Sequence, residues 1–330
     1  MGEGLMRLLP LLALTLVLVV PVGLTACSDD DEGGANGSDE KLRVITSLPL
    51  FADFVRNVGG DRVEVTSLLP LGADPHTFEP SPRDVEKVTE ADIAFANGLD
   101  LEPAVLGIIE PNLPEGAPLV ILAETAIEAG ATTRVGGEEE EEGEEHENEP
   151  EVPAEFAGID PHMWMDPANA TLYVAAVRDA LSEADPDGSE SYEENYTAYV
   201  ADIDEVSDYV STQAEPIPPD RRKLVTTHDA FGYFADAFDF EVVEFVAESP
   251  GGDPSPEDIA QVVAVLEGQG VPAVFTEPQI GEESNILEQA ANDAGVEVCV
   301  LYSDSLDDTV TSYIELMRFN ADELARCLGG

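Results

Sequence analysis

Short apolar runs alternate with amphipathic stretches along most of the chain from residue 41 onward. Runs rich in Val, Ile, Leu and Phe predict buried strands, and apolar residues that recur every three or four positions predict helices between them. The predicted strands cover residues 42–47, 63–69, 93–96, 118–122, 223–227, 241–246, 273–276 and 296–301. Strands that alternate with helices favour parallel sheets with helices on their faces. The pattern therefore predicts an α/β protein.

The middle of the chain predicts two helices in succession. Residues 170–183 are amphipathic and end at an Asp-Pro-Asp-Gly sequence, and residues 189–214 continue until a proline cluster at 216–219 stops the helix. At 1.5 Å per residue the second helix would be roughly 35–40 Å long, enough to run along two lobes.

This pattern divides the chain from residue 41 onward into two lobes and a connector. We expect an N-terminal lobe over 41–169, connecting helices over 170–215 and a C-terminal lobe over 216–330. Each lobe is expected to be a mostly parallel sheet flanked by helices, and the last helix is expected over 308–327.

The N-terminus has the pattern of an export signal. Residues 8–22 are apolar but too short for a comfortable membrane span of roughly 20 residues, so residues 1–26 predict a secretory signal. Leu24-Thr25-Ala26 before Cys27 resembles the lipobox of bacterial lipoproteins, in which the cysteine receives lipid; the alternative is an ordinary signal with a chance cysteine. Residues 27–40 have nothing to pack and predict a flexible acidic tether.

The other two cysteines form a possible pair. If Cys27 carries lipid, Cys299 and Cys327 are left, and an even remainder in an oxidising compartment favours a disulfide. Two separate buried thiols are the alternative, because free cysteine is a common core residue.

The charge of the chain restricts its partners. It has 14 Lys and Arg against 70 Asp and Glu, a formal net charge of -56. This excludes nucleic acid, which requires a basic surface, and it makes cations plausible partners and suggests a salt-rich medium. Residues 136–149 are mostly glutamate and predict a solvated linker, although His146 leaves open a cation-gathering loop.

Three of the four histidines follow predicted strands in similar loops. They lie in the stretches Gly72–Pro80, Asp160–Pro167 and Thr226–Phe231. A lone loop histidine is more often an ordinary surface residue. However, binding residues of α/β proteins gather at the ends of strands, so we predict one metal site built from His76, His162 and His228.

At this point the chain resembles the zinc- and manganese-binding solute-binding lipoproteins of ABC importers. The resemblance covers essentially the whole mature chain. It is carried by Gly72–Arg83, Asn97-Gly98-Leu99 with Glu102, Asp160–Pro167, Thr227–Phe234, Thr276–Gln279 and Tyr302–Leu306. It implies two α/β lobes joined by one long helix, with the metal in the cleft between the lobes.

The resemblance also implies the ligands. His76 and His162 match those of the first lobe, and His228 and Asp304 match those of the second. Members selective for manganese carry a carboxylate where His228 stands, whereas three imidazoles and one carboxylate suit tetrahedral Zn²⁺. We therefore favour zinc, with Mn²⁺ or Fe²⁺ as the alternative.

Two further residues are expected to support the site. Glu277 would orient a ligand histidine through its other ring nitrogen. Trp164 would pack beneath the site, where its indole N–H needs a hydrogen-bond partner.

The implied function is the capture of Zn²⁺ outside the cytoplasm. We expect a monomer, anchored to the cell membrane through lipid on Cys27, that delivers zinc to a permease with a cytoplasmic ATPase and is not an enzyme. A secreted zinc hydrolase is the competing class, but it would keep an open metal position for water, and the chain has no His-Glu-x-x-His motif. A metal-stabilised surface adhesin is a third possibility, because some family members are described that way, but no exposed adhesive motif supports it.

Overall fold

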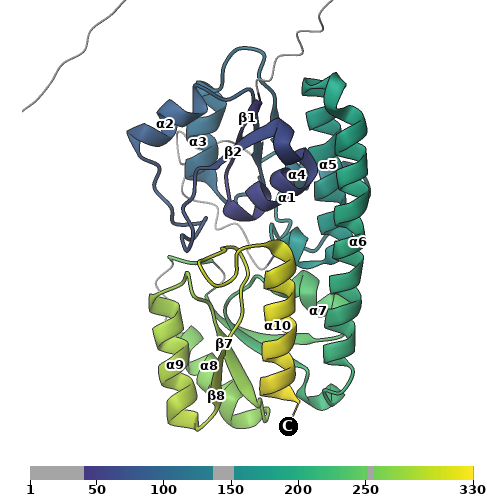
Figure 1. Cartoon of the computed structure of the whole chain (residues 1–330). Coiled ribbons are helices and arrows are strands. Elements are labelled where there is room, and N and C mark those ends of the chain that lie inside the picture. Colours follow the sequence, from purple (N-terminus) through teal and green to yellow (C-terminus); the bar gives the residue numbers. More distant parts are fainter. Residues whose placement is uncertain (1–40, 137–151, 248, 252–255, 330) are drawn as a thin grey trace, which may run out of the picture. The chain divides into compact units, whose positions relative to one another are not determined.

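The computed structural model describes residues 41–136, 152–247, 249–251 and 256–329 (Figure 1). Cys27, His146, the predicted signal and tether, and nearly all of the acidic run lie outside the described residues, so the predictions made for them stay predictions. No helix within the described ranges is both long and apolar enough to cross a membrane.

The first lobe contains a four-stranded parallel sheet in the order β2-β1-β3-β4. Its strands are β1 (Leu42–Thr46), β2 (Val63–Ser67), β3 (Ile93–Ala96) and β4 (Leu119–Ile121). Its helices are α1 (Pro49–Gly59), α2 (Pro82–Val88), α3 (Pro103–Asn112) and α4 (Leu122–Glu128). Three of these helices begin with proline, whose fixed φ suits the first turn and whose missing N–H is not needed there.

The second lobe repeats this topology with the parallel order β6-β5-β7-β8. Its strands are β5 (Lys223–His228), β6 (Glu241–Ala247), β7 (Ala273–Thr276) and β8 (Glu297–Val300). Its helices are α7 (Gly232–Phe238), α8 (Pro256–Gly268), α9 (Glu282–Ala294) and α10 (Tyr313–Leu328). The central strands β1 and β5 end in the same turn: Thr46 Oγ1 donates to Leu48 O at 3.0 Å, and Thr226 Oγ1 donates to His228 O at 2.8 Å.

Two helices connect the lobes. They are α5 (Pro167–Ala184) and the 26-residue α6 (Ser189–Ala214), and short 3-10 turns cover Gly60–Arg62, Met163–Met165, Pro186–Gly188 and Pro219–Arg221. Helix α6 runs beside both lobes (Figure 1). It contacts α5 and, in the first lobe, α1; in the second lobe it contacts α7 and α10. The main cluster of buried side chains includes residues of both lobes, while a smaller cluster lies under α8 and α9. The predicted fold class of two α/β lobes joined by a long helix is therefore confirmed.

Asp53 of α1 joins elements from three parts of the chain. Its Oδ2 accepts hydrogen bonds from the Tyr199 hydroxyl of α6 at 2.9 Å and from the backbone N–H of Tyr313, at the start of α10, at 3.0 Å. Burial raises the pKa of Asp53, although these donors oppose the shift. The carboxyl thus links the first lobe to the connecting helix and to the second lobe.

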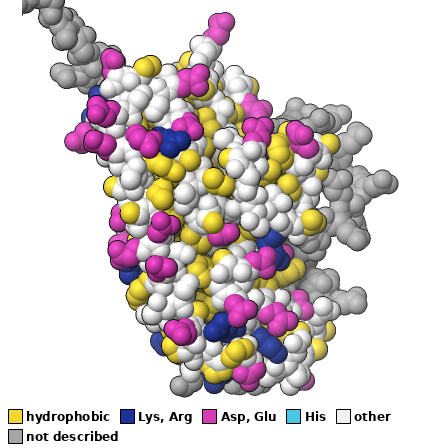
Figure 2. All heavy atoms as spheres, turned by 90° about the vertical axis from the view of Figure 1, so that its right-hand side faces the viewer, with side chains coloured by type: hydrophobic (Ala, Val, Ile, Leu, Met, Phe, Trp, Pro, Cys, Tyr) yellow, Lys and Arg dark blue, Asp and Glu magenta, His cyan; other side chains and the backbone are white. Residues whose placement is uncertain are grey.

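Acidic side chains dominate the solvent face of α6, which carries neither Lys nor Arg. One arginine from each neighbouring helix compensates part of this charge. Arg178 of α5 stacks over the Tyr196 ring at 4.4 Å, and Arg318 of α10 stacks over the Tyr209 ring at 4.6 Å and pairs with Glu205 at 2.7 Å. Figure 2 shows this side of the molecule, where Asp and Glu side chains are spread over the surface and Lys and Arg side chains lie between them.

We expect the thermal unfolding midpoint to rise with salt, because screening weakens repulsion among the unpaired carboxylates. Raising NaCl from about 0.05 M to about 1 M shortens the Debye length from above 10 Å to about 3 Å, and we expect a shift of roughly 5–10 °C. Calorimetry in the presence of a chelator measures this without metal at the site. Sucrose at matched osmolality is the control, and a midpoint that follows sucrose but ignores NaCl would contradict the prediction.

Candidate metal centre

The side chains predicted to bind metal lie beyond the carboxyl ends of strands in both lobes. His228 is the last residue of β5, Asp304 follows β8, and His76 follows β2. His162 lies on the long connection between α4 and α5. Because the carboxyl ends of parallel strands meet at one edge of a sheet, the two sheets bring residues distant in the sequence to one place.

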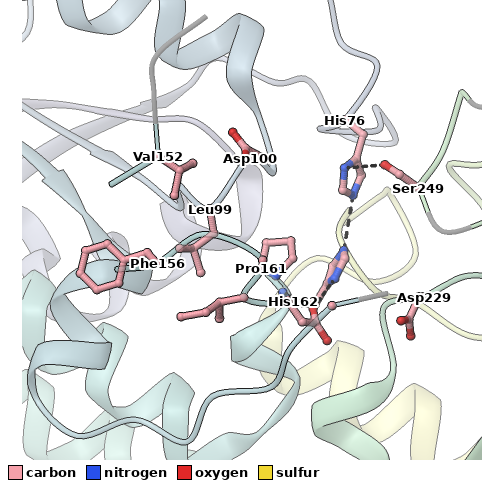
Figure 3. A pocket seen from close by; sticks show the side chains of 13 residues that line it. His76, Leu99, Asp100, Val152, Phe156, Pro161, His162, Asp229 and Ser249 are labelled. Atoms are coloured by element: carbon pink, nitrogen blue, oxygen red, sulfur yellow. Dashed lines mark hydrogen bonds and ion pairs between the residues drawn. The ribbon is translucent and has the colours of Figure 1, made fainter. Parts of the chain in front are cut away.

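The structure brings the ligand atoms of His76, His162, His228 and Asp304 within 4.8 Å of one another. The Nε2 atom of His162 lies 3.4 Å from that of His76 and 3.4 Å from that of His228. The Asp304 carboxylate lies 3.2 Å from His228 Nε2, 3.5 Å from His162 Nε2 and 3.9 Å from His76 Nε2. Ligands at 2.0–2.1 Å around a tetrahedral ion lie about 3.4 Å apart, so these distances fit one ion at the centre. Figure 3 shows the His76 and His162 rings pointing toward each other.

The Asp304 carboxylate has an unusual environment. It is only 1% exposed, and neither oxygen has a hydrogen-bond partner among the described residues. A buried carboxylate without donors is costly unless a cation compensates it. Burial favours its neutral form, but the imidazoles of His162, His228 and His76 hold the pKa of Asp304 well below its usual range. A metal cation between these groups would satisfy both oxygens.

Each imidazole is oriented through its second ring nitrogen, which leaves Nε2 facing the centre. The Nδ1 atoms contact Asp160 Oδ1 at 2.9 Å from His162, Glu277 Oε1 at 3.0 Å from His228, and Ser249 Oγ at 3.2 Å from His76. Such partners fix the tautomer and the ring orientation of metal ligands. Of these three partners, only Glu277 was predicted from the sequence; Asp160 and Ser249 were not.

The sequence Asp-Pro-His occurs twice, and its aspartate makes different hydrogen bonds at the two positions. Asp160 accepts from both the backbone N–H and the ring of His162. Asp74 instead accepts from the backbone N–H of His76 at 3.2 Å and from the Thr77 hydroxyl at 2.6 Å, so it shapes the loop and does not orient the ring. The motif alone could have suggested a partner for His162, but not which of the two aspartates would hold a ring.

Glu277 and Trp164 lie where they can support the ligands. The buried Glu277 carboxylate accepts hydrogen bonds from the hydroxyls of Thr227 and Ser303 in addition to its contact with His228. Trp164 is fully buried, with its ring centroid 5.6 Å from that of His162, and its Nε1 donates to Ser303 O at 3.1 Å. Both side chains thus connect ligand-bearing segments of the chain.

The three imidazoles have different electrostatic surroundings. Burial, together with the charges of the other two histidines, lowers the pKa of His76 to about 3. Burial also disfavours the charged form of His228, but Glu277 and Asp304 outweigh it and raise the pKa of His228 well above its usual value. The carboxylates of Asp304 and Asp160 likewise outweigh burial and raise the pKa of His162. Without metal, the negative charge at the site therefore favours protons on His228 and His162.

A cavity of about 90 Å³ adjoins the cluster on its His76 and His162 side. It is lined by His76, Leu99, Asp100, Phe156, Asp160, His162, Asp229 and Ser249 among others (Figure 3). Separately, Cys299 of β8 and Cys327 of α10 form a disulfide, which ties the strand that leads to Asp304 to the last helix.

Two α/β lobes on a shared helix, with three imidazoles and a carboxylate gathered between them, define a binding protein for a metal cation. The chain belongs to the ZnuA family, described as "Zinc-uptake complex component A periplasmic", whose profile matches residues 44–327. The resemblance inferred from the sequence motifs is thereby confirmed.

Curated relatives of this chain include a lipoprotein named for manganese and one named for metal transport without a particular metal. The manganese-binding lipoprotein MntA of Halalkalibacterium halodurans is 29% identical over 312 residues, which cover 93% of this chain and 95% of MntA. The metal ABC transporter substrate-binding lipoprotein FimA of Streptococcus parasanguinis is 29% identical over 322 residues, which cover 96% and 97%.

Solved structures agree on the fold. The periplasmic zinc-binding protein TroA of Treponema pallidum superposes with a TM-score of 0.74 at 28% identity, covering 88% of this chain and 100% of TroA. The Mn-bound periplasmic metal-binding protein of Candidatus Liberibacter asiaticus gives 0.72 at 25% identity, covering 87% and 100%. The chain is therefore a metal substrate-binding protein of an ABC transporter, and members of this family are transport proteins and not enzymes.

Proposed function

We propose that this chain captures Zn²⁺ outside the cytoplasm and delivers it to the permease of an ABC importer. The proposed ligands are His76, His162, His228 and Asp304. The observation that carries the proposal is the buried Asp304 carboxylate, which has no hydrogen-bond partner among the described residues and lies within 3.2–3.9 Å of three imidazole Nε2 atoms. Three nitrogens and one carboxylate at tetrahedral spacing suit zinc, which binds imidazole well and needs no larger coordination number.

Mn²⁺ is the second candidate substrate. Asp304 presents both oxygens to the imidazoles, Oδ1 toward His162 and Oδ2 toward His228. A carboxylate that binds through both oxygens would raise the coordination number above four, and carboxylate ligands suit harder ions such as Mn²⁺. The manganese names among the relatives also favour this candidate.

The remaining parts of the proposal concern the rest of the chain. Residues 1–26 would be removed as a signal, lipid on Cys27 would anchor the protein at the cell surface, and residues 27–40 would act as a tether. The lobes over 41–169 and 216–330, with connecting helices over 170–215, would work as a monomer that docks on a permease coupled to a cytoplasmic ATPase. The names of lipoprotein relatives support the anchor.

The test is a metal competition on the mature chain. The protein is stripped of metal, offered equimolar Zn²⁺ and Mn²⁺, and analysed for bound metal, together with His228→Glu. We expect one tightly bound zinc per chain, and a shift of the variant toward manganese because a carboxylate replaces a borderline-soft ligand. If the parent prefers manganese, the transport role stands and the zinc assignment is wrong. If the parent binds neither metal, the proposed function is wrong.

Metal affinity is expected to fall as the pH falls. The ion requires the neutral imidazole of each ligand, so it competes with protons on His162 and His228, whose pKa values are raised in the absence of metal. Below those pKa values, the metal affinity falls about tenfold per pH unit for each proton that the metal must displace. His76, with a pKa of about 3, adds no pH dependence near neutrality. Chelator competition from pH 5 to pH 8 measures the slope. An affinity that does not change over this range would contradict the ligand assignment.

A further inference from the structure

Two segments of the first lobe pair beside the metal centre. Val135 and Ile159 form an antiparallel bridge; on either side of it, Asp160 N donates to Arg134 O at 3.0 Å and Gly136 N donates to Gly158 O at 2.9 Å. In a hydrogen-bonded antiparallel pair the two residues normally exchange both of their N–H···O bonds. Between Arg134 and Asp160 only one of these two bonds is present.

A tyrosine of the second lobe takes the place of the second bond. The hydroxyl of Tyr233, on α7, accepts from Arg134 N at 3.0 Å and donates to Asp160 O at 2.9 Å. Tyr233 is only 1% exposed, so these bonds are shielded from water. A side chain from one lobe thus completes a backbone ladder in the other.

The neighbouring contacts hold α7 tightly against this ladder. The Arg134 guanidinium forms an ion pair with Asp236 of α7. At Gly232, the first residue of α7, an added Cβ would come within 2.5 Å of Arg134 Nε. The Tyr233 contact therefore belongs to a close-packed junction between the lobes.

The ladder also carries the residue that orients a proposed ligand. The Asp160 backbone is bound by Tyr233, and its carboxylate accepts from the backbone N–H and the ring of His162 at 3.0 and 2.9 Å. We propose that Tyr233 is a positioning residue for the metal ligand His162. Its hydroxyl binds the second lobe to the backbone of Asp160, and the Asp160 carboxylate in turn orients His162. This inference rests on the proposed metal-binding function. On this proposal the lobes separate here before the metal leaves, so Tyr233 acts on metal retention.

The test compares Tyr233→Phe with a matched control, Tyr192→Phe. Tyr192, in the first turn of α6, is also fully buried, but its hydroxyl donates to Asp185, which directly follows α5 and contacts none of the proposed ligands in the hydrogen bonds of the described residues. For Tyr233→Phe we expect zinc to dissociate about tenfold faster, measured by chelator chase, because two buried backbone groups lose their partner; the association rate is expected to stay unchanged. Tyr192→Phe is expected to release zinc at the parent rate.

A second measurement separates positioning from general stability. If Tyr233 acts through Asp160, the effects of Tyr233→Phe and Asp160→Asn on dissociation will be less than additive in the double variant. Additive effects, or a Tyr233→Phe variant that releases zinc at the parent rate, would overturn the inference and leave the proposed function intact. A parent protein that binds no metal would overturn both. If Tyr233→Phe does not fold, Asp236→Asn tests the same junction from the surface: a rise in release of about two- to threefold supports the inference, and an unchanged rate overturns it.

Discussion

Replacing Asp304 with alanine is expected to weaken zinc binding by at least about 100-fold, more than the loss of a residue that only orients a ligand. Asp304 supplies the only carboxylate among the four proposed ligands, and its two buried oxygens have no other partner among the described residues. The variant would leave three imidazoles to hold a divalent cation without a compensating negative charge. Isothermal titration with Zn²⁺, using a competing chelator for the parent, measures the difference.

The unfolding temperature of the same variant gives a second test of the role of Asp304. Because the variant removes the carboxylate that compensates protonated His162 and His228, the metal-free protein is expected to unfold below the parent temperature, and stabilisation by zinc is largely lost. Asp308→Asn, an exposed acidic residue of the same loop, is the control and is expected to bind zinc within about twofold of the parent. Unchanged zinc occupancy in Asp304→Ala would mean that three histidines suffice, the arrangement of zinc sites that keep a position open for water.

Substituting Glu277 with glutamine is expected to reduce zinc affinity by about 10- to 100-fold. The carboxylate accepts from His228 Nδ1 and from the hydroxyls of Thr227 and Ser303, whereas a glutamine would keep only one acceptor oxygen and would lose the negative charge beside the His228 ring. His228 would lose the partner that keeps its Nε2 aimed at the metal. Titration of the variant measures the loss.

A matched variant shows whether this effect is specific to the ligand contact. Glu283 is also buried, but its carboxylate accepts from the Gly251 backbone and does not contact a proposed ligand. Glu283→Gln is expected to keep zinc affinity within a fewfold of the parent. Equal losses in both variants would indicate that Glu277 contributes to general packing and does not orient His228.

The order of strands and helices could be predicted because each element carries its own periodic signal. The ends of elements were less predictable where side chains compete for backbone groups. The last helix, expected from residue 308, begins at Tyr313 because Asp307 binds the N–H groups of Thr309 and Val310 in a turn and Ser312 then caps the helix. The short helix α4 (Leu122–Glu128) was not predicted, because its apolar start reads as the end of the strand before it.

The proposed ligands were predictable for a different reason. Histidine is rare in this chain, so its few positions stand out, and a known family supplied their grouping. Glu277 was expected in the same way, but Ser249 and the Tyr233 hydroxyl have no such signal. Ser249 is separated from His76 by 173 positions and Tyr233 from Asp160 by 73, and nothing in the local sequence of either serine or tyrosine marks the contact. Such pairings depend on how the two lobes meet, which periodicity does not encode.

The shared turn at the ends of β1 and β5 bears on how metal preference could change in descendants of this protein. Leu48 stands in the first lobe where His228 stands in the second, after the same threonine hydrogen bond. Of the four proposed ligands, His228 alone belongs to a strand, as the last residue of β5, whereas His76, His162 and Asp304 lie on loops and connections. A substitution there would change one proposed ligand, and with it the expected metal preference, while the loops that carry the other three keep their sequence.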